Sequence, residues 1–288
     1  MLTAMLSLLL AEKHSSGYIW ERTKNTDPWV ERYQRVPPAH ETADKLMRYF
    51  LGIDDRVIRY MRRRQHRSVP ELHARFDAVF VIDSSASIKE EDFHRTLRAL
   101  QLLTGKSQQD RRYAAITFSY NATVRFNFTS RRDTLGKLRK IPFEAGMTNT
   151  QDALEICLKE LVLSRGSGAR PGYRKRVLII TDGQSNVDKQ NTLYRAFQLK
   201  RTGTQIFVIA IGKYLKGMSE IIGLASSTDA HLYRVADVNG LLRVVRMIPP
   251  WHIMREYMRR CVAEWNVRTS VLSLQPSSGT LTLSLQEC

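Results

Sequence analysis

Cysteine is scarce in this chain of 288 residues, which carries only three: Cys157, Cys261 and Cys288. So few cysteines exclude the dense disulfide framework of small secreted scaffolds. Their spacing offers neither a CxxC pair nor a zinc-binding Cys/His pattern. Cys157 falls in a leucine-rich helical pattern and is expected to be a buried thiol. Cys261 and Cys288 could pair with each other or with cysteines outside this chain.

Long apolar runs are also missing. No run is long enough to span a bilayer, so a transmembrane helix is not expected. Residues 1–11 are apolar, but the stretch is short and lacks a basic start, which makes it a poor signal peptide. Two glycosylation sequons, at Asn121 and Asn127, modestly favour secretion.

The common catalytic motifs are absent too. The chain has no HExxH, no GxSxG and no paired His–Cys arrangement. Ser85 and Ser87 have no histidine near them in sequence, and His231 is expected to be structural. No GxGxxG follows the first expected strand, which disfavours dinucleotide binding. We therefore do not expect an enzyme.

Basic residues are plentiful: 45 lysines and arginines against 28 acidic residues give a net charge of +17. Most of the excess, +11, lies in residues 76–248. A basic surface attracts nucleic acid, sulfated glycans or anionic lipid headgroups, although it can also serve solubility alone. We expect measurable, salt-sensitive binding to heparin.

Apolar runs alternate with helical periodicity between residues 76 and 248. The uniformly apolar run 78–82 is typical of a strand buried on both faces of a parallel sheet. Residues 123–128 alternate apolar and polar side chains, as expected for an antiparallel edge strand with Asn127 facing outward. The pattern predicts an α/β fold: a doubly wound, Rossmann-like, mostly parallel sheet with one antiparallel edge strand and helices on both faces. Further strands are expected at 113–118, 177–180, 205–211 and 231–235, and helices at 89–104, 150–163, 189–200, 218–226 and 238–247.

Two flanks enclose this domain. In the N-terminal flank, residues 1–75, a basic amphipathic helix is expected at 42–65, and its apolar stripe should pack on the domain or on a partner. The C-terminal tail, 249–288, begins with two prolines that end the preceding helix. Its residues 251–264 suit a helix. The apolar stripe of the N-terminal helix consists of Leu46, Phe50, Ile53, Val57 and Met61.

Three oxygen-rich motifs stand at the ends of these elements. They contribute Asp83, Ser85 and Ser87 from the first motif, Thr148 from the second and Asp182 from the third. In an open α/β sheet, the carboxyl ends of neighbouring strands meet at the point where the strand order reverses. We expect the three motifs to converge there. Two carboxylates and three hydroxyls form a hard-oxygen set that suits Mg²⁺ or Mn²⁺.

Here the chain resembles the von Willebrand factor type A domain with its metal-ion-dependent adhesion site (MIDAS). The DxSxS motif matches at 83–87, and the resemblance covers residues 76–248. It looks closest to extracellular members such as matrilins and collagen type VI. After Gly212 the chain lacks the extra helix of collagen-binding integrins. Further segments also match the family's sequence pattern: Phe-Val-Ile-Asp at 80–83, Ile-Thr-Phe-Ser at 116–119, Asn-Thr-Gln-Asp-Ala-Leu at 149–154, Ile-Thr-Asp-Gly at 180–183, Phe-Val-Ile-Ala-Ile-Gly at 207–212 and Leu-Ala-Ser at 224–226.

The resemblance implies a divalent-cation-dependent protein-binding module of the cell surface or extracellular matrix. The five motif residues and water would surround Mg²⁺, with Asp83 acting partly through water. A partner's Asp or Glu would complete the shell. Mn²⁺ should substitute, whereas Ca²⁺ prefers longer bonds and more ligands. Matrix or collagen-like proteins are the partners that the resemblance implies, and the basic surface adds sulfated glycans as a further expected ligand.

An intracellular member of the same class is the alternative. It would bind RNA or an anionic membrane through the basic surface, although no specific nucleic acid is expected. The sequons and the matrix-like motif text favour secretion, whereas the poor signal peptide and sparse cysteines favour a cytoplasmic protein.

Overall fold

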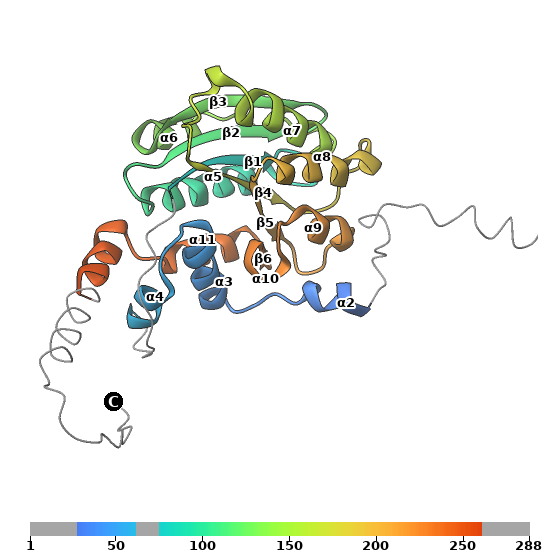
Figure 1. Cartoon of the computed structure of the whole chain (residues 1–288). Coiled ribbons are helices and arrows are strands. Elements are labelled where there is room, and N and C mark those ends of the chain that lie inside the picture. The colour runs from blue at the N-terminus through green and yellow to red at the C-terminus, as the bar shows by residue number, and fades with distance from the viewer. Residues whose placement is uncertain (1–27, 62–74, 261–288) are drawn as a thin grey trace, which may run out of the picture.

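A single six-stranded sheet forms the centre of the molecule (Figure 1). The computed structural model describes residues 28–61 and 75–260. The strand order is β3-β2-β1-β4-β5-β6, and every pair is parallel except β2–β3. The predicted sheet, with its antiparallel edge strand, is therefore confirmed. The strands are β1 (Phe76–Asp83), β2 (Arg112–Phe118), β3 (Ala122–Ser130), β4 (Arg174–Thr181), β5 (Gln205–Ile211) and β6 (Leu232–Val235).

Helices cover both faces of the sheet. Alternation along β1 sends Phe80 and Ile82 to one face, where α5 and α11 pack. It sends Val79 and Val81 to the other, where α7, α8 and α9 pack. Burial on both faces explains the uniformly apolar runs of the sequence. These helices are α5 (Glu90–Gly105), α7 (Thr150–Ile156), continued by η5 (Cys157–Val162), α8 (Lys189–Arg201), α9 (Met218–Leu224) and α11 (Val238–Met247). Shorter helices are α6 (Arg131–Leu138), η6 (Arg165–Ser167) and α10 (Thr228–His231).

The N-terminal segment differs from the single helix expected at 42–65. Gly52 adopts a left-handed φ of +70° and ends the first helix, so a second one starts three residues later. Phe50 and Val57 on the predicted stripe are buried in the same core as α5 and α11. Packing of the stripe on the sheet domain is confirmed, and residues 62–65 lie outside the described part. The segment contains α2 (Pro28–Glu31), η3 (Arg32–Gln34), α3 (Ala39–Lys45), η4 (Leu46–Phe50) and α4 (Asp55–Met61).

Side chains of this segment form hydrogen bonds with residues that come much later in the sequence, in the region of β5 and β6. Lys45 Nζ donates to the carbonyl oxygens of Leu232 (2.7 Å) and Thr228 (3.2 Å). Gln34 Nε2 donates to Leu215 O (2.8 Å), and Gln34 Oε1 accepts from Leu215 N (3.0 Å). The N-terminal helices are thus bound to the β5–β6 side of the sheet.

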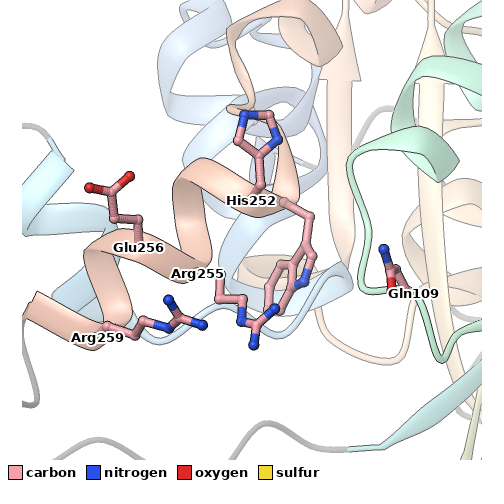
Figure 2. A pocket seen from close by; sticks show the side chains of 6 residues that line it. Gln109, His252, Arg255, Glu256 and Arg259 are labelled. Carbon is pink, nitrogen blue, oxygen red and sulfur yellow. The ribbon is translucent and has the colours of Figure 1, made fainter.

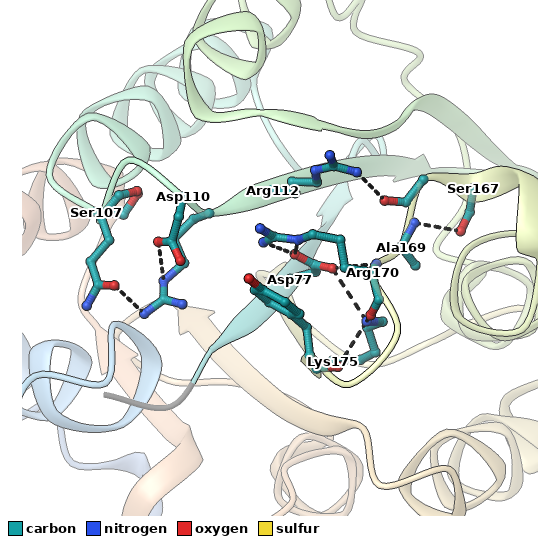
Figure 3. Close-up of polar contacts among 12 residues, drawn as sticks. Asp77, Ser107, Asp110, Arg112, Ser167, Ala169, Arg170 and Lys175 are labelled. Carbon is teal, nitrogen blue, oxygen red and sulfur yellow. Dashed lines mark hydrogen bonds and ion pairs between the residues drawn. The ribbon is translucent and has the colours of Figure 1, made fainter. Parts of the chain in front are cut away.

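Asp77, fully buried at the start of β1, organises the amino ends of the strands (Figure 3). Its carboxylate accepts from Arg170 N (2.8 Å) and Nε (2.9 Å), and from Lys175 Nζ (3.4 Å). These contacts fasten the glycine-rich stretch 166–172 beside β4. The stretch lies at the sheet end opposite Asp83, where it cannot act with the oxygen-rich motifs.

After α11 the chain continues as a helix over residues 251–260. Within the described residues, no helix is long and apolar enough to cross a membrane. Cys157 is buried, as expected, and burial raises the pKa of its thiol to about 12. Cys261 and Cys288, with the remainder of the tail, lie outside the described residues.

Candidate metal centre

Two neighbouring strands deliver the carboxylates of the candidate centre. Asp83 is the last residue of β1, and Asp182 directly follows β4. β1 and β4 are adjacent and parallel, with Ile82 opposite Ile180. This places both carboxylates at the same edge of the sheet, where the order of strands reverses. The predicted convergence of the first and third motifs is observed.

A chain of hydrogen bonds joins the two carboxylates through the serines of the first motif. Ser85 N donates to Asp83 Oδ1 (3.0 Å). The Ser85 and Ser87 hydroxyls lie 2.9 Å apart, and Ser87 Oγ donates to Asp182 Oδ1 (3.0 Å). Four of the five predicted side chains therefore form one cluster of oxygens.

Thr148, the fifth residue, is fixed by backbone contacts to both loops. Ala86 N donates to Gly146 O (2.7 Å), which binds the Thr148 loop to the loop after β1. On the other side Thr148 N donates to Asn186 Oδ1 (2.8 Å), and Thr148 O accepts from Ser185 Oγ (2.9 Å). Thr148 thus lies between the segments that carry the two aspartates.

The loop before Thr148 has no room for a side chain at Gly146. A Cβ there would lie 2.9 Å from Tyr120 N and 3.0 Å from Ser119 Cβ. Asn149 caps α7, its side chain accepting from Asp152 N (3.3 Å). Glycine lets the loop approach the β2–β3 turn, and the Asn149 cap fixes where the helix begins.

Burial makes the two carboxylates costly to ionise together. It raises the pKa of Asp83 to about 6, and the charge of Asp182 adds to the rise, whereas hydrogen bonds from Thr181 and Ser85 oppose it. Burial also raises the pKa of Asp182. A divalent cation beside both groups would stabilise their charged forms. The residues present therefore fit a metal ion.

The donor chemistry narrows the choice of ion. Two carboxylates and three hydroxyls are all hard oxygen ligands, which suit Mg²⁺ and Mn²⁺. Within residues 28–61 and 75–260, no three His, Cys, Asp or Glu side chains gather as a metal-binding group. The centre itself has only two carboxylates, and its other three donors are hydroxyls.

Residues besides the five predicted ligands support the centre. Thr181 Oγ1 donates to Asp83 Oδ2 (2.7 Å) and orients that carboxylate. Glu220, buried on α9, accepts from Ser185 N (2.7 Å). Since Ser185 also binds Thr148 O, α9 is connected to the Thr148 loop. Thr181 belongs to the third oxygen-rich motif, although it was not predicted as a ligand, whereas the helical pattern around Glu220 gives no sign of its role.

Replacing Glu220 by glutamine should flatten the pH dependence of stability. Burial raises the pKa of Glu220 from 4.5 to about 7, so the folded protein holds the proton more tightly than the unfolded chain. The stabilisation is complete below pH 4.5 and is lost as the pH rises through 7. Relative to Glu220→Gln, the wild-type free energy of unfolding should fall by up to about 3 kcal/mol over this range.

Urea unfolding in EDTA at a series of pH values measures this difference. Glu160→Gln, which changes an exposed glutamate, corrects for the loss of one negative charge. Parallel curves for wild type and Glu220→Gln between pH 4.5 and 7.5 would contradict the prediction.

Known proteins resemble this chain over the region just described. The family model of the von Willebrand factor type A domain matches residues 77–246. Vitrin from mouse is 28% identical over 178 residues, covering 60% of this chain and 26% of vitrin. The collagen alpha-4(VI) chain of mouse is 30% identical over 142 residues, covering 47% of this chain and 6% of the collagen chain.

Solved structures of proximal thread matrix protein 1 from the mussel byssus share the fold. One has a TM-score of 0.55 at 19% identity and covers 61% of this chain and 47% of its own. Another, described with a zinc-occupied MIDAS motif, has a TM-score of 0.52 at 25% identity and covers 61% and 45%. The chain spans about a quarter of vitrin and less than half of the byssal protein.

Proposed function

Because this chain belongs to the von Willebrand factor type A domain family, we propose that it binds a protein partner through a divalent cation. Asp83, Ser85, Ser87, Thr148 and Asp182 would hold the ion. The observation that carries the proposal is the chain of oxygens that joins the carboxylates of β1 and β4 through the two serines.

The partner's contribution follows from the charge of this set. Only two of the five donors are anionic, so they would at most neutralise a bound divalent ion, which would keep its electrophilic character and could accept a carboxylate from outside. The partner would supply that carboxylate from an Asp or Glu side chain. Asp83, hydrogen-bonded by Thr181 and Ser85, would act partly through water.

Mg²⁺ is the ion that these residues suit best, with Mn²⁺ as a substitute. Ca²⁺ should support binding less well because it prefers longer bonds and more ligands. Zn²⁺ prefers nitrogen and sulfur ligands, but a byssal relative is described with zinc in its MIDAS motif. Zn²⁺ therefore belongs among the ions tested.

We propose that the protein is secreted and acts in the extracellular matrix. The names of the relatives support it, since they include collagen VI chains and a thread matrix protein. Both sequon asparagines, Asn121 and Asn127, are exposed at the β3 edge of the sheet, where glycans fit. The intracellular alternative would use the basic surface for RNA or an anionic membrane. We do not propose catalysis, since neither histidine nor cysteine is among the five side chains of the centre.

The test of this function is partner capture from an extracellular matrix extract. Binding should require Mg²⁺ or Mn²⁺, fail in EDTA and fail with Asp182→Ala. Amidation of the carboxyl groups in the extract should remove the same binding, since no partner carboxylate would remain. Capture that survives both EDTA and amidation would overturn the proposal.

Glycosylation tests the location. In animal cells, wild type should lose mass on treatment with an N-glycosidase, and Thr129→Val should lack the glycan of Asn127. Thr129→Ser keeps the sequon and should keep the glycan. An unmodified chain that accumulates inside the cells would instead favour the intracellular alternative.

A further inference from the structure

Helix 251–260 lies outside the matched family region and lines a cavity of ≈ 480 Å³ (Figure 2). The loop before β2 contributes one residue, and the helix contributes the others. The helix is docked, because Met254 is fully buried and Lys106 Nζ donates to Val245 O (2.7 Å) at the end of α11. The lining residues are Gln109, Trp251, His252, Arg255, Glu256 and Arg259.

The cavity is positively charged. Trp251, Arg255 and Arg259 follow at intervals of four residues, so they share one face of the helix. Within the described residues, neither arginine forms an ion pair, and both are exposed. The single acidic residue of the lining, Glu256, is paired with Arg260. Two guanidinium groups are therefore free to bind an anion beside an indole ring.

A second cavity of ≈ 490 Å³ extends the basic surface onto the preceding helix. The exposed residues Arg243 and Arg246 line it, together with Asn239, Leu242 and Met247. Only residues 248–250 separate α11 from helix 251–260. A chain-like anion of more than one unit could therefore contact both helices.

The cavity of Trp251 lies at the end of the sheet opposite the metal centre. α11 starts after β6 on the side of the sheet that carries Asp83 and Asp182, and it ends at Met247 on the opposite side. Gln109 precedes β2, again at the amino ends of the strands. A ligand here would not compete with one at the metal ion.

The chemistry favours a sulfated sugar chain over other polyanions. Guanidinium forks match the paired oxygens of a sulfate group. The indole of Trp251 is partly buried against the core, and the rest of its apolar surface lines the cavity, where a sugar ring can contact it. Membrane binding would need several exposed apolar side chains, but only Met247 is exposed among those on the two described helices. Met254 is buried, and Trp251, Tyr257 and Met258 pack on the core. Single-stranded nucleic acid prefers several aromatic stacking platforms, and this cavity has one.

We propose that the cavity binds a sulfated glycosaminoglycan, with Arg255 and Arg259 contacting sulfate and Trp251 contacting a sugar ring. Arg243 and Arg246 bind further sulfates along the chain. The site gives the module two independent attachments: a protein carboxylate at the metal centre and a glycan at the opposite end of the sheet.

The test is isothermal titration of the full chain with a size-defined heparin octasaccharide in EDTA. Arg255→Gln combined with Arg259→Gln should weaken binding at least about tenfold, since two charge-assisted contacts are lost. Arg132→Gln combined with Arg139→Gln removes the same charge from exposed positions on and beside α6. This control should weaken binding less than about twofold through the loss of net charge alone.

Equal losses in the two double variants would overturn the proposal and leave only non-specific charge. Tighter binding of phosphatidylserine vesicles or of an oligothymidylate, lost in the same Arg255/Arg259 variant, would also overturn it. Asp182→Ala should bind the octasaccharide like wild type. The glycan site and the metal site can therefore fail separately.

Discussion

Asp182→Ala is expected to lower the affinity for Mn²⁺ at least about 100-fold, the upper range seen when only an outer-shell partner of a metal site is removed. The substitution deletes one of the two carboxylates of the centre and leaves the hydroxyl of Ser87 without its acceptor. Mg²⁺ binding should fall in parallel. Titration calorimetry with each ion alone measures the effect without a protein partner.

Thermal unfolding adds a second signature for the same variant. The charge of Asp182 raises the pKa of buried Asp83, so the two groups repel each other when no cation is present. In EDTA at neutral pH, Asp182→Ala should therefore melt at or above the wild-type temperature. Addition of Mn²⁺ should raise the melting temperature of wild type only.

Asp110→Ala serves as the control, because Asp110 is exposed in the loop before β2, at the end of the sheet opposite the metal centre. It should leave Mn²⁺ affinity unchanged within about twofold, as expected for a distant surface charge. Equal Mn²⁺ affinities of wild type and Asp182→Ala would contradict the assignment of the centre.

Phe50→Ala should cost about 3–5 kcal/mol of unfolding free energy, the range for a fully buried phenylalanine. Its ring lies 5.3 Å from that of Phe207 and 6.1 Å from that of Phe76, measured between centroids. Its carbonyl oxygen accepts a hydrogen bond from buried Arg176. The substitution opens a cavity between the N-terminal helices and the sheet.

Urea unfolding of the full chain measures the loss against a matched variant. Phe197→Ala removes a phenylalanine that is 40% exposed on α8 and should cost less than about 1 kcal/mol. Similar values for the two variants would mean that residues 39–61 do not share the core of the sheet domain.

Much of the architecture was predictable because its signals are local. Uniformly apolar runs such as 78–82 and 177–180 are imposed by burial on both faces of the sheet, and the oxygen-rich residues directly follow two of these strands. The rule that ligands collect at the carboxyl ends of the strands then brings Asp83 and Asp182 together. Register and hydrogen bonds agree with that placement.

Other features depend on contacts that no periodicity records. The stripe spacing continues across Gly52, so the pattern hides the break between η4 and α4. Glu220 looks like any helical glutamate until folding brings it to Ser185. The cavity of Trp251 exists only because its helix docks beside residue 109. By contrast, the sequence does contain a signal for α6, although this helix was not predicted. Ser130 is its N-cap and accepts a hydrogen bond from Asp133 N.

The long-range contacts of the N-terminal helices have a consequence for folding during synthesis. Lys45 is made 187 residues before its acceptor Leu232, and Gln34 is made 181 residues before Leu215. Synthesis adds about 5–20 residues per second, so about 10 to 40 s pass between synthesis of the apolar stripe and synthesis of the later strands that pack on it. A nascent chain therefore carries Leu46 and Phe50 only partly covered until β5 and β6 emerge. A ribosome stalled before β6 would leave a product whose first-made helices still lack part of their packing surface, and such a product would be a target for chaperones.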